Sequence, residues 1–249
     1  VDLTGIGADR FELACRELAP LRESAGRSRP LARRLPLTDL IGAVDPAAVG
    51  GGWRQPTPRA VLGAGTDGPT TLDLDADGPH LLIAGTTGSG KSELLLTLIA
   101  ALAVACPPRA LTFLLVDYKG GSAFRSVSEL PHVVGVVTDL DPALSGRALA
   151  SLRAELRRRE RISATGGPAP PRLVLVIDEF ATLAAELPEF LAGVLDIAQR
   201  GRSLGLHLVL ATQRPAGVVS PAVRANISAR ICLRVTDPAD SVDVIAGPD

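Results

Sequence analysis

The feature that most constrains the fold of this chain is the stretch from Gly85 to Ser92, with the sequence GTTGSGKS. It satisfies the pattern G-x-x-x-x-G-K-[ST] and lies between an apolar predicted strand and an apolar predicted helix. Glycines here let the backbone curl so that successive N–H groups point at phosphate oxygens, and the N-terminus of the helix adds its positive end. Lys91 can reach the β- and γ-phosphates of ATP, and the Ser92 hydroxyl can bind Mg²⁺. A chance match in a glycine-rich turn is disfavoured because Lys91 is one of only two lysines in the chain. The predicted phosphate-binding residues are Gly85, Thr86, Thr87, Gly88, Ser89, Gly90, Lys91 and Ser92.

Apolar strands and helices alternate from His80 onward. The run Leu173–Ile177 is continuously apolar, which is typical of a strand buried on both faces of a parallel sheet. The sequence therefore predicts an α/β fold with a mostly parallel central sheet flanked by helices. The predicted strands are His80–Ala84, Leu111–Val116, Val133–Val137, Leu173–Ile177, Leu206–Ala211 and Ala229–Val235. The predicted helices are Lys91–Cys106, Pro142–Arg161, Pro188–Leu204 and Pro238–Ile245.

The N-terminal part of the chain is patchier. A short amphipathic helix is predicted around Phe11–Leu18, followed by Arg- and Pro-rich stretches and a turn at Gly50-Gly51-Gly52. We interpret residues 1–57 as a linker with a small ordered adaptor and residues 58–249 as the main domain. Ala60–Gly63 and Thr70–Leu74 are predicted to form a β-hairpin. Because the chain lacks Met, we expect it to be a domain from a longer protein. Because it stops at Asp249, near where further strands would be expected, we also expect truncation at its C-terminus.

Composition excludes several classes of protein. The chain has 249 residues, of which 46% are hydrophobic and 21% charged, as in soluble globular proteins. The apolar run Leu94–Cys106 is too short to span a bilayer. The formal net charge of −1 gives no basic surplus for nucleic-acid binding. Cys15, Cys106 and Cys232 are far apart and outside any C-x-x-C pattern, which argues against disulfides and metal and favours a reducing cytoplasm.

Two further strand ends carry candidate catalytic residues. Asp178 and Glu179 follow a buried strand, whose C-terminal end is where α/β proteins bind ligands. Asp178 can hold the shell of Mg²⁺, and Glu179 can activate the attacking water by accepting its proton. The alternative is an acid pair that caps the next helix. Gln213 ends another apolar strand, where its amide could contact the γ-phosphate; the alternative is a surface residue at the start of a loop.

Basic residues leave more alternatives open. Lys119 lies beside a glycine pair and could contact nucleotide, substrate or a neighbouring subunit, or could lie in a solvated turn. Arg147 and Arg230 are possible arginine fingers for a neighbouring subunit. Arg157–Arg159 and Arg161 are interpreted as the solvated face of a helix. A GTPase is disfavoured because no Asn-Lys-x-Asp signature is present. For the three histidines, His80, His132 and His207, packing is favoured over catalysis.

Five segments carry a resemblance to the FtsK/SpoIIIE family of hexameric motor ATPases. The resemblance is dense over about residues 75–247 and loose over the first 57. The segments are GTTGSGKSELL (85–95), VDYKGGSAF (116–124), LVLVIDEFATL (173–183), RGRSLGLHLVLATQRP (200–215) and NISARICLRV (226–235).

The family has two branches with different cargo. DNA translocases pump duplex DNA, whereas the type VII secretion ATPases of the EccC/EssC kind export small helical proteins. The segments Lys119-Gly120-Gly121 and AGVVSPAVRAN (216–226) resemble the secretion branch. ATQRP (211–215) occurs in both branches and does not separate them.

The resemblance implies a RecA-like P-loop ATPase that uses ATP and Mg²⁺ and has a competent site. It implies a motor for type VII protein export, with double-stranded DNA translocation as the alternative. The implied partners are other copies in a ring, such as a homo-hexamer, secreted helical proteins or double-stranded DNA, and other domains of the same chain. The implied location is the cytoplasmic part of a membrane-anchored bacterial protein.

The resemblance also assigns roles to single residues. Independently of the resemblance, the loop is expected to be a surface turn in which Lys91 contacts nothing while the loop is empty, so that Lys91→Ala lowers ATP affinity severely and leaves the fold intact. The implied roles are phosphate binding by Lys91 and Ser92, Mg²⁺ binding by Ser92 and Asp178, water activation by Glu179, sensing by Gln213, an arginine finger at Arg147, and a basic position on the last strand at Arg230.

Overall fold

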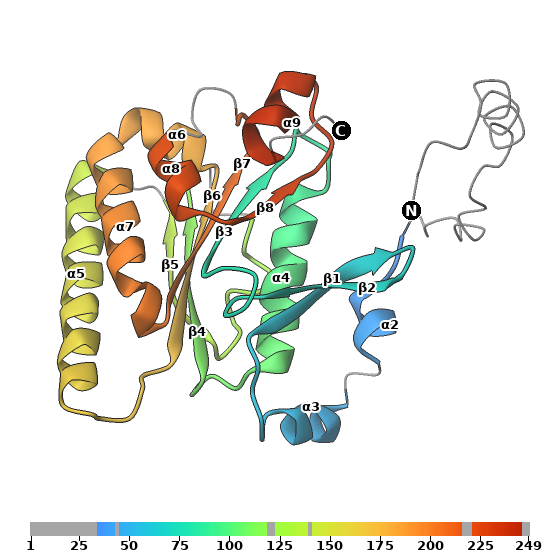
Figure 1. Cartoon of the computed structure of the whole chain (residues 1–249), viewed down its shortest axis with the longest axis horizontal. Helices are drawn as coiled ribbons and strands as arrows, with labels where there is room; N and C mark the ends of the chain where they lie inside the picture. Colours follow the sequence, from blue (N-terminus) through green and yellow to red (C-terminus); the bar gives the residue numbers. More distant parts are fainter. Residues whose placement is uncertain (1–33, 43–44, 119–122, 139–140, 216–220, 246–249) are drawn as a thin grey trace, which may run out of the picture.

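The computed structural model describes residues 34–42, 45–118, 123–138, 141–215 and 221–245. Within these residues a six-stranded sheet lies between helices, and a separate two-stranded hairpin packs beside it (Figure 1). The strand order is β5-β4-β6-β7-β3-β8, and all neighbouring strands are parallel. The predicted α/β fold with a mostly parallel sheet is confirmed.

The strands follow the apolar runs of the sequence closely. Strand β8 is the exception, since it ends at Cys232 and not at Val235 as expected. The hairpin consists of β1 (Arg59–Gly65) and β2 (Gly68–Asp73). The sheet consists of β3 (His80–Ala84), β4 (Leu111–Asp117), β5 (Val133–Thr138), β6 (Arg172–Asp178), β7 (Leu206–Thr212) and β8 (Ala229–Cys232).

The four predicted helices are present, and the described residues contain four further short helices that the sequence patterns did not predict. Gly50-Gly51-Gly52 is not a separate turn, because these glycines complete helix α3. The predicted helix around Phe11–Leu18 lies outside the described residues. The helices are α2 (Leu37–Ile41), α3 (Pro46–Gly52), α4 (Lys91–Ala105), α5 (Pro142–Ala164), α6 (Phe180–Glu186), α7 (Pro188–Gly201), α8 (Pro221–Asn226) and α9 (Pro238–Ile245), and the 3-10 helix η1 is Arg202–Leu204.

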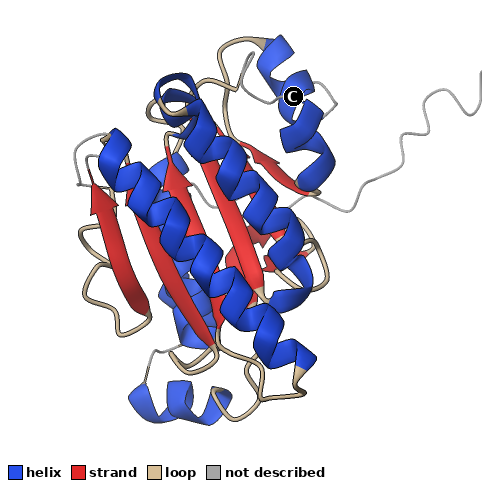
Figure 2. Ribbon diagram, turned by 90° about the vertical axis from the view of Figure 1, so that its left-hand side faces the viewer, coloured by secondary structure: helices blue, strands red, loops and turns tan. Residues whose placement is uncertain are grey.

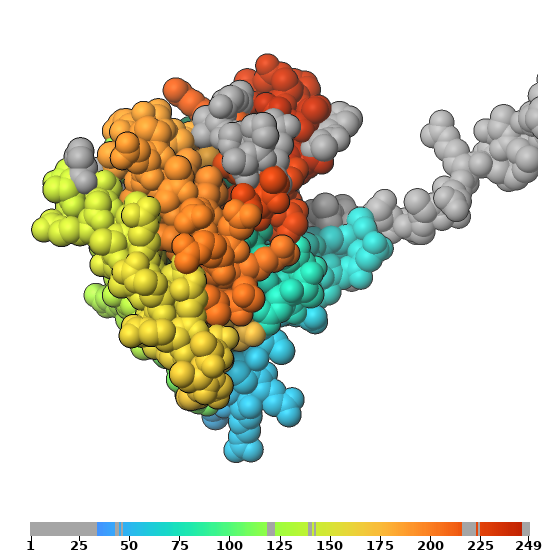
Figure 3. All heavy atoms as spheres, turned by 60° about the vertical axis from the view of Figure 1, so that its left-hand side comes forward, coloured from blue at the N-terminus to red at the C-terminus, as the bar shows by residue number. Residues whose placement is uncertain are grey.

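Successive side chains along the central strands face opposite sides of the sheet, and this alternation divides the core into two layers. On β6, Leu175 and Ile177 face the layer that contains α5, α6 and α7. Val174 and Val176 face the opposite layer, which contains α4 and the hairpin. Figure 2 shows helices lying across the face of the sheet that α5, α6 and α7 cover. Figure 3 shows α5 and α7 side by side on the surface of the molecule. Burial on both faces explains why these strands are continuously apolar.

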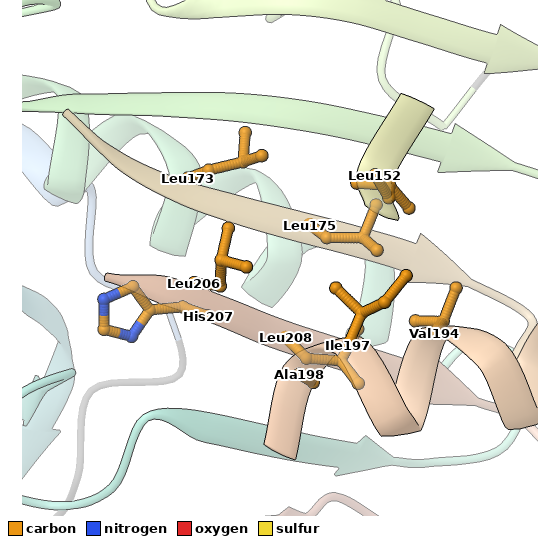
Figure 4. Close-up of a pocket in the computed structure, with 9 residues that line it drawn as sticks. All are labelled: Leu152, Leu173, Leu175, Val194, Ile197, Ala198, Leu206, His207 and Leu208. Atoms are coloured by element: carbon orange, nitrogen blue, oxygen red, sulfur yellow. The ribbon is translucent and has the colours of Figure 1, made fainter. Parts of the chain in front are cut away.

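The α5–α7 layer is closely packed. Figure 4 shows Leu152 of α5 and Val194 of α7 lining the same apolar cavity as the leucines of β6 and β7. The cavity that they enclose has a volume of about 20 Å³ and an almost entirely apolar lining. A space of this size holds no ligand larger than water. The binding site must therefore lie elsewhere.

The segment before the hairpin is anchored to the main sheet domain. Trp53 Nε1 donates to the Val104 carbonyl at 3.0 Å, and the Trp53 ring meets the His132 ring edge-on at 6.1 Å. The Cys106 thiol donates to the Thr57 carbonyl at 3.2 Å. Among the residues that the structure describes, no helix is both long and apolar enough to cross a lipid bilayer.

Candidate functional site

The glycine-rich loop connects β3 to α4 at the C-terminal edge of the sheet. At Gly85 a Cβ atom would lie 2.4 Å from Ser89 Oγ and 2.8 Å from Leu233 Cβ, so no larger residue fits without displacing the loop. Gly90 precedes α4 with a φ of 97°, a conformation that residues with a Cβ rarely adopt. These two glycines therefore allow the sharp turn from strand to helix that a phosphate-binding loop requires.

The tips of neighbouring strands hold the loop in place. Thr86 donates to the Arg234 carbonyl both from its N–H, at 3.1 Å, and from its hydroxyl, at 3.0 Å. The Thr87 hydroxyl donates to Gln213 Oε1 at 2.6 Å. The structure thus brings Gln213, at the tip of β7, directly against the loop. A loop fixed at successive residues is organised for phosphate binding before a ligand arrives.

Lys91 is not free in this structure. Its ammonium group is ion-paired with Asp178 Oδ1, and its side chain is only 4% exposed. The expectation that Lys91 contacts nothing in an empty loop is therefore wrong. Each charge of this buried pair is stabilised by the other, because both would be costly alone in a medium of low dielectric constant. Ser92, the next residue, is exposed.

Glu179 combines backbone strain with an unpaired carboxylate oxygen. Its φ of 59° is the one positive φ at a non-glycine residue within the described ranges. Its N–H donates to Asp178 Oδ1 at 2.9 Å, and its side chain is buried. Glu179 Oε2 is buried without a hydrogen-bond partner among the described residues. Strain of this kind costs about 1–3 kcal/mol and occurs mostly at functional sites.

Asp117 is a site residue that the sequence reasoning missed. It ends β4 directly opposite Asp178 of β6, so the two acids lie at neighbouring strand tips. Asp117 is buried, and its Oδ2 accepts a hydrogen bond from the Ala123 N–H at 2.9 Å. The signal was present in the sequence, because Asp117 follows an apolar strand just as Asp178 does.

The predicted arginine fingers differ in their surroundings. Arg147 is exposed near the start of α5. The guanidinium of Arg230 is directed at its own chain: Nε donates to the Ile227 carbonyl at 3.0 Å and Nη1 to the Val244 carbonyl at 3.3 Å. Lys119 lies outside the described residues.

Arg159 differs from the expected solvated face. It is buried, and its guanidinium donates to Glu155 Oε1 at 2.8 Å and to the carbonyls of Leu204 and Pro171 at 2.8 and 2.6 Å. It therefore joins α5 to the segments that precede β6 and β7. Sequence spacing alone could not separate this buried arginine from Arg158, which is exposed and paired with Glu155.

The histidines lie at the opposite, N-terminal edge of the sheet. Burial, with smaller effects of His207 and Arg202, lowers the pKa of His80 to about 4. His80 Nδ1 accepts a hydrogen bond from the Leu208 N–H at 3.1 Å. His207 Nδ1 lies 3.1 Å from the Pro79 carbonyl, and burial lowers its pKa as well. These contacts serve packing and place the histidines away from the loop.

The chain is similar in sequence to proteins of a known family. Residues 52–167 match the model of the FtsK/SpoIIIE family. The chain is 40% identical over 233 residues to the type VII secretion system protein EssC of Staphylococcus aureus, covering 84% of this chain and 16% of EssC. This chain thus spans about one sixth of that relative.

Two solved structures are also similar. The cytoplasmic domain of the type VII secretion ATPase EccC from Thermomonospora curvata superimposes with a TM-score of 0.76 at 35% identity, covering 86% of this chain and 28% of that one. ATPases 2 and 3 of EccC from the same organism, in complex with a signal sequence peptide, give a TM-score of 0.65 at 30% identity, covering 74% of this chain and 37% of that one. These matches confirm the resemblance drawn from the sequence.

Proposed function

Because the chain carries a P-loop ATPase domain of the FtsK/SpoIIIE family, we propose that it is a motor domain that hydrolyses ATP to power protein export by a type VII secretion system. The observation that carries the hydrolytic part is the position of Glu179. A buried carboxylate with one unpaired oxygen lies beside Asp178 and is held there by a strained backbone. This arrangement suits a base that accepts a proton from water.

Nucleotide binding uses the loop and the buried ion pair. The phosphates bind at the loop of residues 85–92, and Lys91 exchanges its bond to Asp178 for one to the phosphates. Asp178 is then available, with the Ser92 hydroxyl, to hold Mg²⁺. Their oxygen donors suit this ion, and Ser92 is exposed to receive it. The bound ion would neutralise charge that develops on the phosphates.

Hydrolysis is assigned to Glu179, with Gln213 as a sensor. Glu179 orients and deprotonates the attacking water. Gln213 already contacts Thr87 of the loop, so a change in the loop is transmitted directly to the tip of β7. The sensor role needs such a link between loop and sheet.

Assembly into a ring, such as a homo-hexamer, would complete the site. The exposed Arg147 is available to a neighbouring copy, and an arginine supplied by a neighbour stabilises charge in the transition state. Arg230 is the weaker candidate, because its guanidinium already contacts carbonyls of its own chain. Other domains of the same, longer protein would be further partners.

Protein cargo is favoured over double-stranded DNA. The EccC structure with a signal sequence peptide supports recognition of secreted helical proteins. On α5, Arg158 is paired with Glu155 and Arg159 is buried, whereas Arg153, Arg157 and Arg161 are exposed, so the choice of protein cargo rests on the peptide complex and not on this helix face. The proposed location is the cytoplasmic part of a membrane-anchored bacterial protein.

The cargo proposal is tested by measuring the ATPase rate with signal peptides and with duplex DNA, each at low and moderate salt. We expect stimulation by a peptide that depends little on salt, because buried side chains dominate such recognition. Strong stimulation by DNA that falls steeply with salt, with none by peptide, would establish the translocase alternative.

A further inference from the structure

The chain that leaves the sheet after β8 borders the phosphate-binding loop. Leu233 N–H donates to the Ala84 carbonyl at 2.8 Å, which continues the pairing of β8 with β3 one residue past the end of β8. The next carbonyl, that of Arg234, accepts both bonds from Thr86. The backbone at residues 233 and 234 therefore fixes the first half of the loop.

The side chain of Arg234 then crosses to the middle of the loop. Its Nη2 donates to the Gly88 carbonyl at 3.4 Å, while the residue stays exposed. Arg230, the basic residue that the sequence singled out on this strand, is instead directed at the Ile227 and Val244 carbonyls. The arginine that contacts the loop is thus Arg234.

This position has an electrostatic consequence. In a loop whose N–H groups are directed at phosphates, carbonyls such as that of Gly88 are left for other donors. A guanidinium has five N–H donors, and the bond to Gly88 uses one of them. Lys91 is buried and paired with Asp178. Arg234 is therefore an exposed cation at the loop, whereas Lys91 must first leave its partner.

We propose that Arg234 is a positioning residue of the nucleotide site: it holds the loop through Gly88 and supplies a second positive charge, from the same chain, for the phosphates of the nucleotide. This proposal rests on the proposed ATP-binding function. It predicts that Arg234 contributes to nucleotide affinity and little to the folding of the domain, since its backbone contacts to Thr86 do not depend on the side chain.

The test is the affinity of the chain for a fluorescent ATP analogue with Mg²⁺, measured for Arg234→Met, Arg234→Lys and the control Arg202→Met. Arg202 is also exposed but lies in η1, before β7, at the opposite edge of the sheet. We expect Arg234→Met to weaken binding about tenfold, because a charge-assisted hydrogen bond is lost. Arg234→Lys, which keeps the charge and one donor, should stay within about threefold of the wild type. Arg202→Met should bind as the wild type does, and melting temperatures without nucleotide should agree.

The outcomes separate this inference from the proposed function. If the wild type binds the analogue and Arg234→Met binds equally well, the role of Arg234 is refuted while the site stands. Equal losses in Arg234→Met and Arg234→Lys would also refute it, because charge would then not matter. If the wild type itself does not bind the analogue, the proposed ATP-binding function, on which this inference rests, is refuted.

Discussion

At the scale of single residues, the site depends on one buried ion pair. Lys91 and Asp178 neutralise each other at the tip of β6, where both side chains are largely shielded from water. In the proposed function, phosphate binding requires Lys91 to change partners, and Asp178 would then be free to bind a metal ion. The proposal therefore predicts that the same two residues contribute to the stability of the empty domain and to its affinity for nucleotide.

Lys91→Ala should accordingly destabilise the empty domain as well as abolish ATP binding. The variant leaves the buried Asp178 carboxylate without its cation, and such losses cost on the order of 3 kcal/mol. Urea unfolding without nucleotide measures the effect. The matched variant Lys91→Ala with Asp178→Asn removes the unpaired charge and should recover part of the stability. If Lys91→Ala alone unfolds at the wild-type urea concentration, the ion pair does not stabilise the domain.

At the scale of elements, helix α3 shows where local sequence signals mislead. Three consecutive glycines normally favour a turn, yet Gly50, Gly51 and Gly52 are helical. The helix is fixed by contacts at its ends: the Asp45 side chain accepts from the Ala47 N–H at 3.3 Å, and Trp53 bonds to Val104 of α4. Tertiary anchoring thus overrides the low helix propensity of glycine.

Gly51→Ala should therefore stabilise the domain by about 0.5–1 kcal/mol, because alanine loses less backbone freedom in a helix. A Cβ at this position meets nothing within 4 Å. Gly68→Ala is the matched control, since Gly68 has a φ of 127° in the hairpin turn and the change should be destabilising there. Thermal unfolding compares the two. Destabilisation by Gly51→Ala would indicate that these glycines form a turn after all.

Most elements could be predicted because their signals are local. Strand β3 and helix α9 have the predicted bounds, since an apolar run or a proline start marks each of them. The Gln213 contact to Thr87 and the contact of Arg234 to Gly88 could not be predicted, because each joins residues more than a hundred positions apart. The strained backbone of Glu179 likewise depends on the packing around it.

At the scale of the whole molecule, the edge of the sheet opposite the site responds to pH. His80, His132 and His207 are all buried, and burial lowers the pKa of each. An unfolded chain binds protons at these histidines below about pH 6.5, whereas the folded chain does so only at lower pH. The contribution of these histidines to the free energy of unfolding is therefore fully present above pH 6.5, and it is progressively lost as the pH falls toward 4.

His80→Asn isolates this effect, because an Asn oxygen can still accept the Leu208 N–H. When the pH is lowered from 7 to 5, the free energy of unfolding of the wild type should fall. In the variant this fall should be smaller by roughly 1–2 kcal/mol. Urea unfolding at several pH values provides the comparison. Identical pH dependence in both proteins would show that His80 is not responsible.

The most direct test of the account is the steady-state rate of ATP hydrolysis by Glu179→Gln at saturating ATP and Mg²⁺. The variant keeps the side-chain shape but cannot accept the proton from water, so turnover should fall by about 10²–10⁴ while ATP affinity stays near the wild-type value. Glu189→Gln, which neutralises an exposed acid at the start of α7, should turn over at the wild-type rate. Hydrolysis by Glu179→Gln at the wild-type rate would contradict the assignment of this edge as the catalytic site.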